Sequence, residues 1–186
     1  MAVFFTALDE SSANGVLDSL GSKYVIIDYS MATGKFYAMI EWADKNQEDF
    51  FEVYYQSKAD KLVPVVLYYP AYYQSMCSRL YNFGGEEWIP KTTTVIYSTD
   101  QQLVNTAGER FKAKVISDQK TFPTYQEAQA FLETNPEYII VGTDPFVSPV
   151  PLEKLEHYEL RYKSPTIAVT RGEETISRVE VFEYFP

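Results

Sequence analysis

The feature that most constrains the fold is a change in hydrophobic period near residue 85. Before that point apolar residues recur mostly at helical spacing, and beyond it they alternate with polar residues as in strands. We therefore expect an α+β fold: a mainly helical N-terminal core with a few short strands, followed by a β-rich C-terminal part, either an antiparallel sheet or a small barrel. We expect residues 1–108 to form the helical core and residues 109–186 to pack on it.

Cap and turn residues predict where the individual elements begin and end. Asp9 to Ser12 supply cap residues ahead of a helix that Gly21 ends, and Thr124 to Glu127 form a capping box ahead of another. Pro64 favours an edge position for its strand, because proline cannot donate to a ladder. The other expected helices cover residues 31–42, 46–56 and 71–83. The expected strands cover residues 23–27, 63–69, 92–99, 111–117, 137–142, 157–164, 166–171 and 178–184.

Composition excludes one class of partner. The 186 residues carry a formal net charge of −10. Nucleic-acid affinity comes mainly from clustered Lys and Arg, so we expect no nucleic-acid partner.

The 16 Tyr and 12 Phe predict many half-buried rings, because a tyrosine hydroxyl needs a polar partner. No apolar run reaches the roughly 18 residues of a transmembrane helix, so we expect the chain itself to be soluble.

Cys77 and His157 are the only residues of their kinds. A single cysteine cannot form an internal disulfide, and these two residues are too few for a zinc site or for a nucleophile with its base and orienting group. We interpret both as structural. The sequence therefore predicts no catalytic residue and no metal ligand in this chain.

The most informative stretch runs from Asp28 to Met39. Asp28, Met31, Lys35 and Met39 follow one another at intervals of three, four and four residues, so one continuous helix would carry them on a narrow face. Asp28 would cap the start of that helix. Gly34 costs a helix interior about 1 kcal/mol relative to alanine, and it could let the helix kink or partly unwind. On spacing alone, such a stripe is more often core packing than a binding surface.

The identities of these residues add a family resemblance. The segment YVIIDYSMATGKFYAM resembles the C-terminal globular domain of the archaeal oligosaccharyltransferase catalytic subunit, a membrane enzyme that transfers glycan from a lipid carrier to asparagine. The family's motif has the form D-x-x-M-x-x-x-K-x-x-x-M/I, and Asp28, Met31, Lys35 and Met39 fill it without a gap. The resemblance continues over FFTALDESSANGVLDSLGSK and to PLEKLEHYELRY and RVEVFEY. It is strongest over residues 4–42 and weakest over residues 85–150.

The chain also departs from the family. The WWDYG motif, expected just N-terminal to this region, is not in the sequence, and Trp42 and Trp88 lie in contexts that do not replace it. The transmembrane portion is not in the sequence either. The resemblance therefore implies that a divalent metal (Mn or Mg) and the lipid-linked oligosaccharide bind the full-length enzyme through that missing portion. It also implies that this chain alone is inactive, and that it lies on the extracytoplasmic face of the membrane as part of a multi-pass protein.

For the motif itself, the resemblance implies half of a pocket for the acceptor sequon Asn-X-Ser/Thr. In the family, the lysine–methionine helix stands beside WWDYG near the hydroxyl residue that follows the acceptor asparagine by two positions. Methionine side chains suit the threonine methyl group, and Lys35 would supply a donor near the hydroxyl or a peptide carbonyl. Asp28 would fix the start of the helix.

Two other readings remain open at the level of sequence. The chain could be a stand-alone secreted module whose tyrosine-rich β region binds carbohydrate or protein. It could also be an unrelated small hydrolase that uses paired carboxylates, Glu86-Glu87 or Glu173-Glu174. Adjacent acids usually mark solvated turns and point to different sides, which disfavours the hydrolase.

Overall fold

The computed structural model describes residues 1–186 apart from residues 59–60, 172–173 and 178, with no description of side chains over residues 166–178. The chain divides into two compact units. The first unit comprises Met1–Asp49, Ala71–Trp88 and Leu152–Pro186, and the second comprises Phe50–Pro70 and Ile89–Pro151. The boundary expected between residues 108 and 109 falls inside the second unit, in the turn that joins two of its strands.

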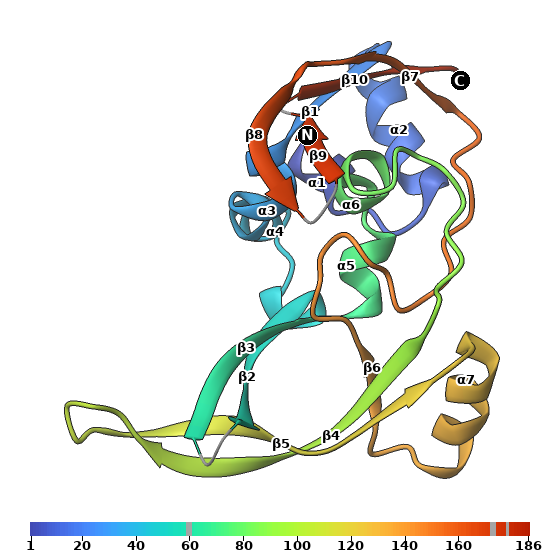
Figure 1. The fold of residues 1–186 in the computed structure, drawn as a ribbon. Coiled ribbons are helices and arrows are strands. Elements are labelled where there is room, and N and C mark those ends of the chain that lie inside the picture. The colour runs from blue at the N-terminus through green and yellow to red at the C-terminus, as the bar shows by residue number, and fades with distance from the viewer. Residues whose placement is uncertain (59–60, 172–173, 178) are drawn as a thin grey trace. The chain divides into compact units, whose positions relative to one another are not determined.

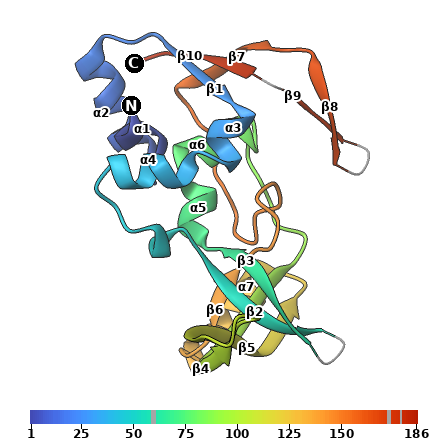
Figure 2. The ribbon, with the colours of Figure 1, turned by 90° about the vertical axis from the view of Figure 1, so that its left-hand side faces the viewer.

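The first unit combines short helices with a three-stranded antiparallel sheet (Figures 1 and 2). The strand order is β1 (Tyr24–Asp28), β10 (Val179–Tyr184) and β7 (Tyr158–Lys163), so the last strand of the chain is the central one. A separate hairpin, β8 (Thr166–Arg171) and β9 (Glu174–Ser177), lies between β7 and β10 in the chain. The helices are α1 (Ala2–Phe5), α2 (Glu10–Leu20), α3 (Tyr29–Thr33), α4 (Phe36–Trp42), the 3-10 helix η1 (Gln47–Asp49), α5 (Pro70–Gln74), which starts at the unit boundary, and α6 (Met76–Tyr81).

One face of this sheet is buried and the other is exposed. Val25 and Ile27 of β1 and Phe182 of β10 are fully buried, whereas Tyr24 and Ile26 are exposed. This alternation is the period-2 pattern of a half-buried strand. The helical part of the core is aromatic, and the rings of Phe36 and Tyr72 meet edge to face with their centroids 5.2 Å apart.

The start and end of α2 agree with the sequence prediction. The side chain of Asp9 accepts a hydrogen bond from the backbone N–H of Ser12 at 2.7 Å. Gly21 ends the helix in the left-handed region with φ 61°, and its backbone N–H donates to carbonyls of the last turn.

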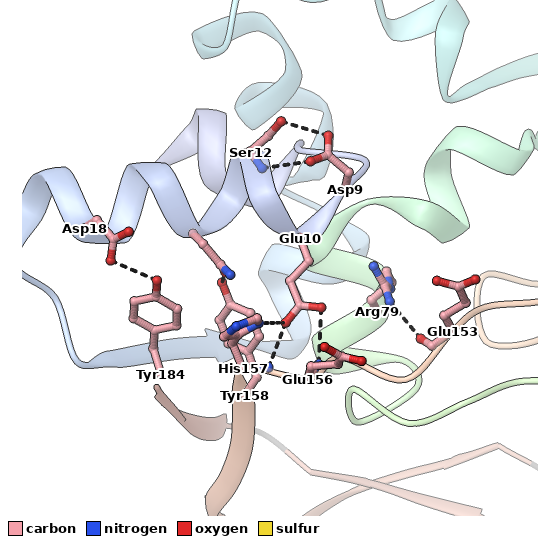
Figure 3. Close-up of polar contacts among 11 residues, drawn as sticks. Asp9, Glu10, Ser12, Asp18, Arg79, Glu153, Glu156, His157, Tyr158 and Tyr184 are labelled. Atoms are coloured by element: carbon pink, nitrogen blue, oxygen red, sulfur yellow. Dashed lines mark hydrogen bonds and ion pairs between the residues drawn. The ribbon is translucent and has the colours of Figure 1, made fainter. Parts of the chain in front are cut away.

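The C-terminal segment is tied to α2 by polar contacts (Figure 3). The carboxylate of Glu10 accepts hydrogen bonds from the backbone N–H groups of Glu156 at 3.2 Å and His157 at 2.8 Å. The same carboxylate lies 3.0 Å from the His157 ring Nδ1. Further along the helix, the hydroxyl of Tyr184 donates to Asp18 at 2.8 Å. These bonds join residues from opposite ends of the chain.

The second unit is a five-stranded sheet covered by one helix, α7 (Tyr125–Thr134). Its strands, in sheet order, are β3 (Lys61–Tyr68), β2 (Phe51–Lys58), β5 (Arg110–Phe122), β4 (Thr93–Val104) and β6 (Ile139–Val141). A bridge between Tyr68 and Gly142 links the two edges of the sheet, with N···O distances of 2.8 and 2.9 Å. The sheet therefore curls around a small core that contains Tyr54, Leu67, Ile96 and Val141.

The fold class predicted from the sequence is confirmed, as are Pro64 on an edge strand and the Thr124 cap of α7. Three predicted helices are wrong in detail. Residues 46–56, expected as one helix, contain instead only the 3-10 helix η1 (Gln47–Asp49), and from Phe51 they belong to strand β2. The expected helices over 31–42 and 71–83 are each broken in two, the first at Gly34–Lys35 and the second at Ser75, whose side chain caps α6.

Within the described residues, no helix is both long and apolar enough to span a lipid bilayer. Apolar side chains on the helices of the first unit contribute to its buried core. Leu17 of α2 and Ile40 of α4, for example, are fully buried.

Candidate functional site

Asp28 lies where β1 ends and α3 begins, as the motif predicts. Its side-chain Oδ1 accepts hydrogen bonds from the backbone N–H of Met31 at 2.9 Å and the hydroxyl of Ser30 at 2.5 Å. Partial burial opposes ionisation of the carboxyl group. The two hydrogen bonds and the positive charge of Lys35 outweigh that effect and hold the pKa of Asp28 below its usual value. Asp28 is therefore an anionic cap that fixes the start of α3.

The motif is not one continuous helix. The backbone N–H groups of Gly34 and Lys35 both donate to the carbonyl of Ser30, at 2.9 and 2.7 Å. This shared acceptor ends α3, and Lys35 then occupies the N-cap position ahead of α4, where its side chain makes no capping hydrogen bond. The single narrow stripe expected for the four motif residues is therefore wrong.

The two methionines differ in exposure. Met31 is partly buried, whereas Met39 is 5% exposed and belongs to the hydrophobic core. Lys35, at the break between the two helices, is exposed. A ligand can therefore reach Met31 and Lys35 in this conformation, whereas Met39 is covered by the packing of α4 in the core.

Tyr72 is a supporting residue whose role the sequence did not reveal. It lies in the segment that was expected to be a helix over residues 71–83, and the partner of its hydroxyl group is visible only in the folded structure. That hydroxyl donates to the carbonyl of Ala32 in α3 at 2.9 Å, and it also lies 3.3 Å from the side-chain nitrogen of Asn82. The need of a buried tyrosine for a polar partner was the available signal. Tyr72 thus fixes the C-terminal end of α3 while Asp28 fixes its start.

A buried carboxylate lies in the strand next to Asp28. Glu180 of β10 stands opposite Ile27, and one of its oxygens accepts from the ammonium group of Lys163 at 2.9 Å. The other oxygen has no hydrogen-bond partner among the described residues. Burial raises the pKa of Glu180 despite the ion pair, and burial together with the charge of Glu180 raises the pKa of Tyr81. A largely buried carboxylate therefore lies in the strand that pairs with β1.

The described residues do not group into a metal site. Across the part of the chain that the structure describes, no three His, Cys, Asp or Glu side chains lie close enough together to hold a metal ion. The divalent metal expected for the full-length enzyme therefore has no ligands that can be assigned among the described residues. Of the acid pairs considered for a hydrolase, Glu86 and Glu87 are exposed, Glu86 pairs with Lys154 at 3.3 Å, and Glu173 lies outside the described residues.

Comparison with known proteins supports the family resemblance. No protein-family model matches the chain. The dolichyl-phosphooligosaccharide-protein glycotransferase 3 of Archaeoglobus fulgidus is 28% identical over 138 residues, which cover 56% of this chain and 16% of that protein.

Two crystal structures of the oligosaccharyltransferase of Archaeoglobus fulgidus are also similar. One, tethered by a disulfide bond to an acceptor peptide with the NVT sequon, is 27% identical with a TM-score of 0.39, covering 53% of this chain and 14% of that one. The other, in the apo form, is 17% identical with a TM-score of 0.47, covering 98% and 22%. Since both TM-scores are below 0.5, the relationship depends on the sequence similarity.

The chain is thus homologous to the oligosaccharyltransferases, a class of glycosyltransferases. This similarity supports the resemblance of the segment from Asp28 to Met39 to a C-terminal domain of the archaeal catalytic subunit.

Proposed function

We propose that this chain is a domain of a membrane oligosaccharyltransferase that transfers glycan from a lipid-linked donor to Asn in Asn-X-Ser/Thr sequons, and that Asp28, Met31, Lys35 and Met39 help to bind the sequon Ser/Thr. The observation that carries the proposal is the complete motif in a chain that is 28% identical to a dolichyl-phosphooligosaccharide-protein glycotransferase. The chain spans 16% of the length of that relative, so the activity of the whole enzyme is part of the proposal.

The geometry of the motif supports a binding role. Asp28 and Tyr72 hold both ends of α3, which keeps the partly buried Met31 in place. The thioether of Met31 would contact the threonine methyl group, and the exposed ammonium group of Lys35 would donate to the hydroxyl or to a peptide carbonyl. Such a pocket could discriminate threonine from a residue that lacks both groups by about 1–3 kcal/mol.

The remaining partners follow from the same proposal. The lipid-linked oligosaccharide and a divalent metal would bind the transmembrane portion of the full-length enzyme, and this domain would lie on the extracytoplasmic face of the membrane. The domain alone would not transfer glycan, because the resemblance assigns the metal and the lipid-linked oligosaccharide to the transmembrane portion. Glycan transfer by the isolated chain would contradict this.

The test uses the full-length enzyme and a peptide acceptor that contains Asn-Val-Thr. Lys35→Ala should raise the KM for the peptide roughly tenfold, which is the effect of losing one hydrogen bond from a charged donor. Lys23→Ala is the matched control, since Lys23 is another exposed lysine of the first unit. Equal KM values for the Lys35 and Lys23 variants would remove Lys35 from the binding site.

The methionines need separate variants, because their burial differs. Met31→Ala should raise the KM while the domain stays folded. Met39→Ala should instead destabilise the domain by about 2–5 kcal/mol, because it leaves a cavity in the core. Urea denaturation of each variant separates loss of binding from loss of folding. If Met31→Ala leaves the KM unchanged, the proposed contact between Met31 and the threonine methyl group is wrong.

A further inference from the structure

The second unit contains a hollow at the place where β2 and β5 run side by side. These strands are paired in parallel over only two positions, Tyr54 with Lys114 and Tyr55 with Val115. The hollow beside this short ladder has a volume of about 390 Å³ and is lined by residues of β2, β5 and β4. Small-molecule sites generally begin at about 300 Å³, so this volume suits a ligand of one or two rings.

The charged groups of the hollow balance one another. The ammonium group of Lys114 contacts both carboxylate oxygens of Glu52, at 2.6 and 2.7 Å. The ammonium group of Lys112 lies 2.7 Å from the carboxylate of Asp100. The four side chains have a formal net charge of zero, which favours neither an anionic nor a cationic ligand. A purely apolar ligand would strip water from four charges, at a high free-energy cost.

The carboxylate of Glu52 is oriented before any ligand arrives. Besides Lys114 it accepts a hydrogen bond from the hydroxyl of Tyr69, whose oxygen in turn lies 2.7 Å from the hydroxyl of Tyr54. The Glu52 side chain is 15% exposed, so it reaches the hollow while most of its surface is covered. A group held in this way loses little conformational entropy on binding.

An aromatic pair supplies the apolar part of the lining. The ring centroids of Tyr55 and Phe111 are 5.7 Å apart, and both side chains are partly exposed. The hollow therefore combines ring surface with fixed acceptors and donors. A sugar ring has the matching chemistry: its C–H face packs on an aromatic ring, and each hydroxyl group can donate to a carboxylate and accept from an ammonium group.

We propose that the hollow formed by Glu52, Tyr55, Asp100, Phe111, Lys112 and Lys114 is a binding site for a neutral saccharide. This site belongs to the second unit, whereas the motif from Asp28 to Met39 belongs to the first, so it does not depend on the proposed sequon binding.

The test is a titration of the ¹⁵N-labelled chain, followed by amide NMR shifts. The probes are the methyl glycosides of glucose, mannose, galactose and N-acetylglucosamine, with inorganic phosphate and an Asn-Val-Thr peptide as comparison ligands. At least one glycoside should shift the amides of Val53 and Ala113, which line the hollow, in a saturable manner with a Kd in roughly the millimolar range.

Two variants test the residues, and one serves as the control. Lys112→Gln and Phe111→Leu should each weaken glycoside binding roughly tenfold, through loss of a charged donor or of an aromatic face. Lys120→Gln removes another lysine of β5 that pairs with an acid, Asp118 at 3.1 Å, but lies outside the hollow, and binding should not change.

Several outcomes would overturn the proposal. These are no saturable shift with any glycoside, shifts that lie away from the hollow, or binding that Lys112→Gln and Phe111→Leu leave intact. Shifts at the hollow with phosphate or the Asn-Val-Thr peptide alone would also overturn it, because the ligand would then be an anion or a polypeptide. Each result leaves the KM test of Lys35 unaffected.

Discussion

The carboxylate of Asp28 does two things at once in the motif. It accepts a hydrogen bond from the backbone N–H of Met31 and so sets where α3 begins. Its negative charge also interacts electrostatically with the positive charge of Lys35. The position of Met31 relative to β1 therefore depends on one side chain. Lys35 depends on a second feature, the shared Ser30 carbonyl that ends α3.

Replacing Asp28 should therefore lower the stability of the domain in a pH-dependent way. We expect Asp28→Ala to reduce the free energy of unfolding by about 1 kcal/mol near neutral pH, because the cap is lost. The pKa of Asp28 is lowered in the folded state, so its contribution is present above the ordinary value of 3.8 and is lost as the pH falls through the folded-state pKa. Urea denaturation should show a smaller difference in the free energy of unfolding between Asp28→Ala and wild type near pH 3 than near pH 7. Asp28→Asn, which keeps a cap acceptor, should cost less at neutral pH. A difference that does not change with pH would contradict the anionic cap.

At the scale of elements, the sequence predicted those whose signals are local. The strand before Asp28, the caps of α2 and α7 and the edge position of β3 all follow from neighbouring residues. β2 was missed because its acidic and aromatic residues also fit helical spacing. What makes it a strand is pairing with β3 and an ion pair between Glu52 and Lys114, which are 62 positions apart. The break at Ser75 was not predicted, and the one at Gly34 was left open as a possible kink. The hydrogen-bond acceptors and the packing that stabilise each short helix are visible only in the folded structure.

The break at Gly34 leads to a prediction about backbone conformation. Gly34 has φ −90° and ψ −32°, and an added Cβ would meet only the Ser30 carbonyl oxygen, at an ordinary 3.7 Å. Gly34→Ala should therefore stabilise the domain by about 0.4–1 kcal/mol, because it restricts the unfolded chain. Gly21→Ala is the matched comparison: at φ +61° it should destabilise by about 1 kcal/mol. Both changes can be measured by urea denaturation. If Gly34→Ala destabilised as much as Gly21→Ala, the break would require glycine itself.

At the scale of the whole molecule, each unit is closed by contacts between distant parts of the chain. In the first unit β10, at the C-terminus, fills the centre of a sheet whose edge strand β1 lies near the N-terminus. In the second unit, the segment that contains β2 and β3 completes a sheet with strands that follow residue 89. Such assembly cannot be predicted from local patterns, because each strand's period is the same whichever partner it has. It also means that single side chains can decide whether the ends of the chain stay together.

Glu10 is such a side chain. Its carboxylate accepts hydrogen bonds from two backbone N–H groups of the segment before β7 and contacts the ring of His157 (Figure 3). The Glu10 side chain is 18% exposed. We expect Glu10→Ala to lower the free energy of unfolding by about 1.5–3 kcal/mol, because these backbone donors lose a charged acceptor. Glu41→Ala, at an exposed glutamate of α4, should stay within about 0.5 kcal/mol of wild type. Hydrogen exchange supplies a local readout: the amide of His157 should exchange faster in the Glu10 variant than in the Glu41 variant, since its acceptor is gone. Equal exchange rates in the two variants would mean that packing of Tyr158 and Tyr184, rather than Glu10, holds the two ends of the chain together.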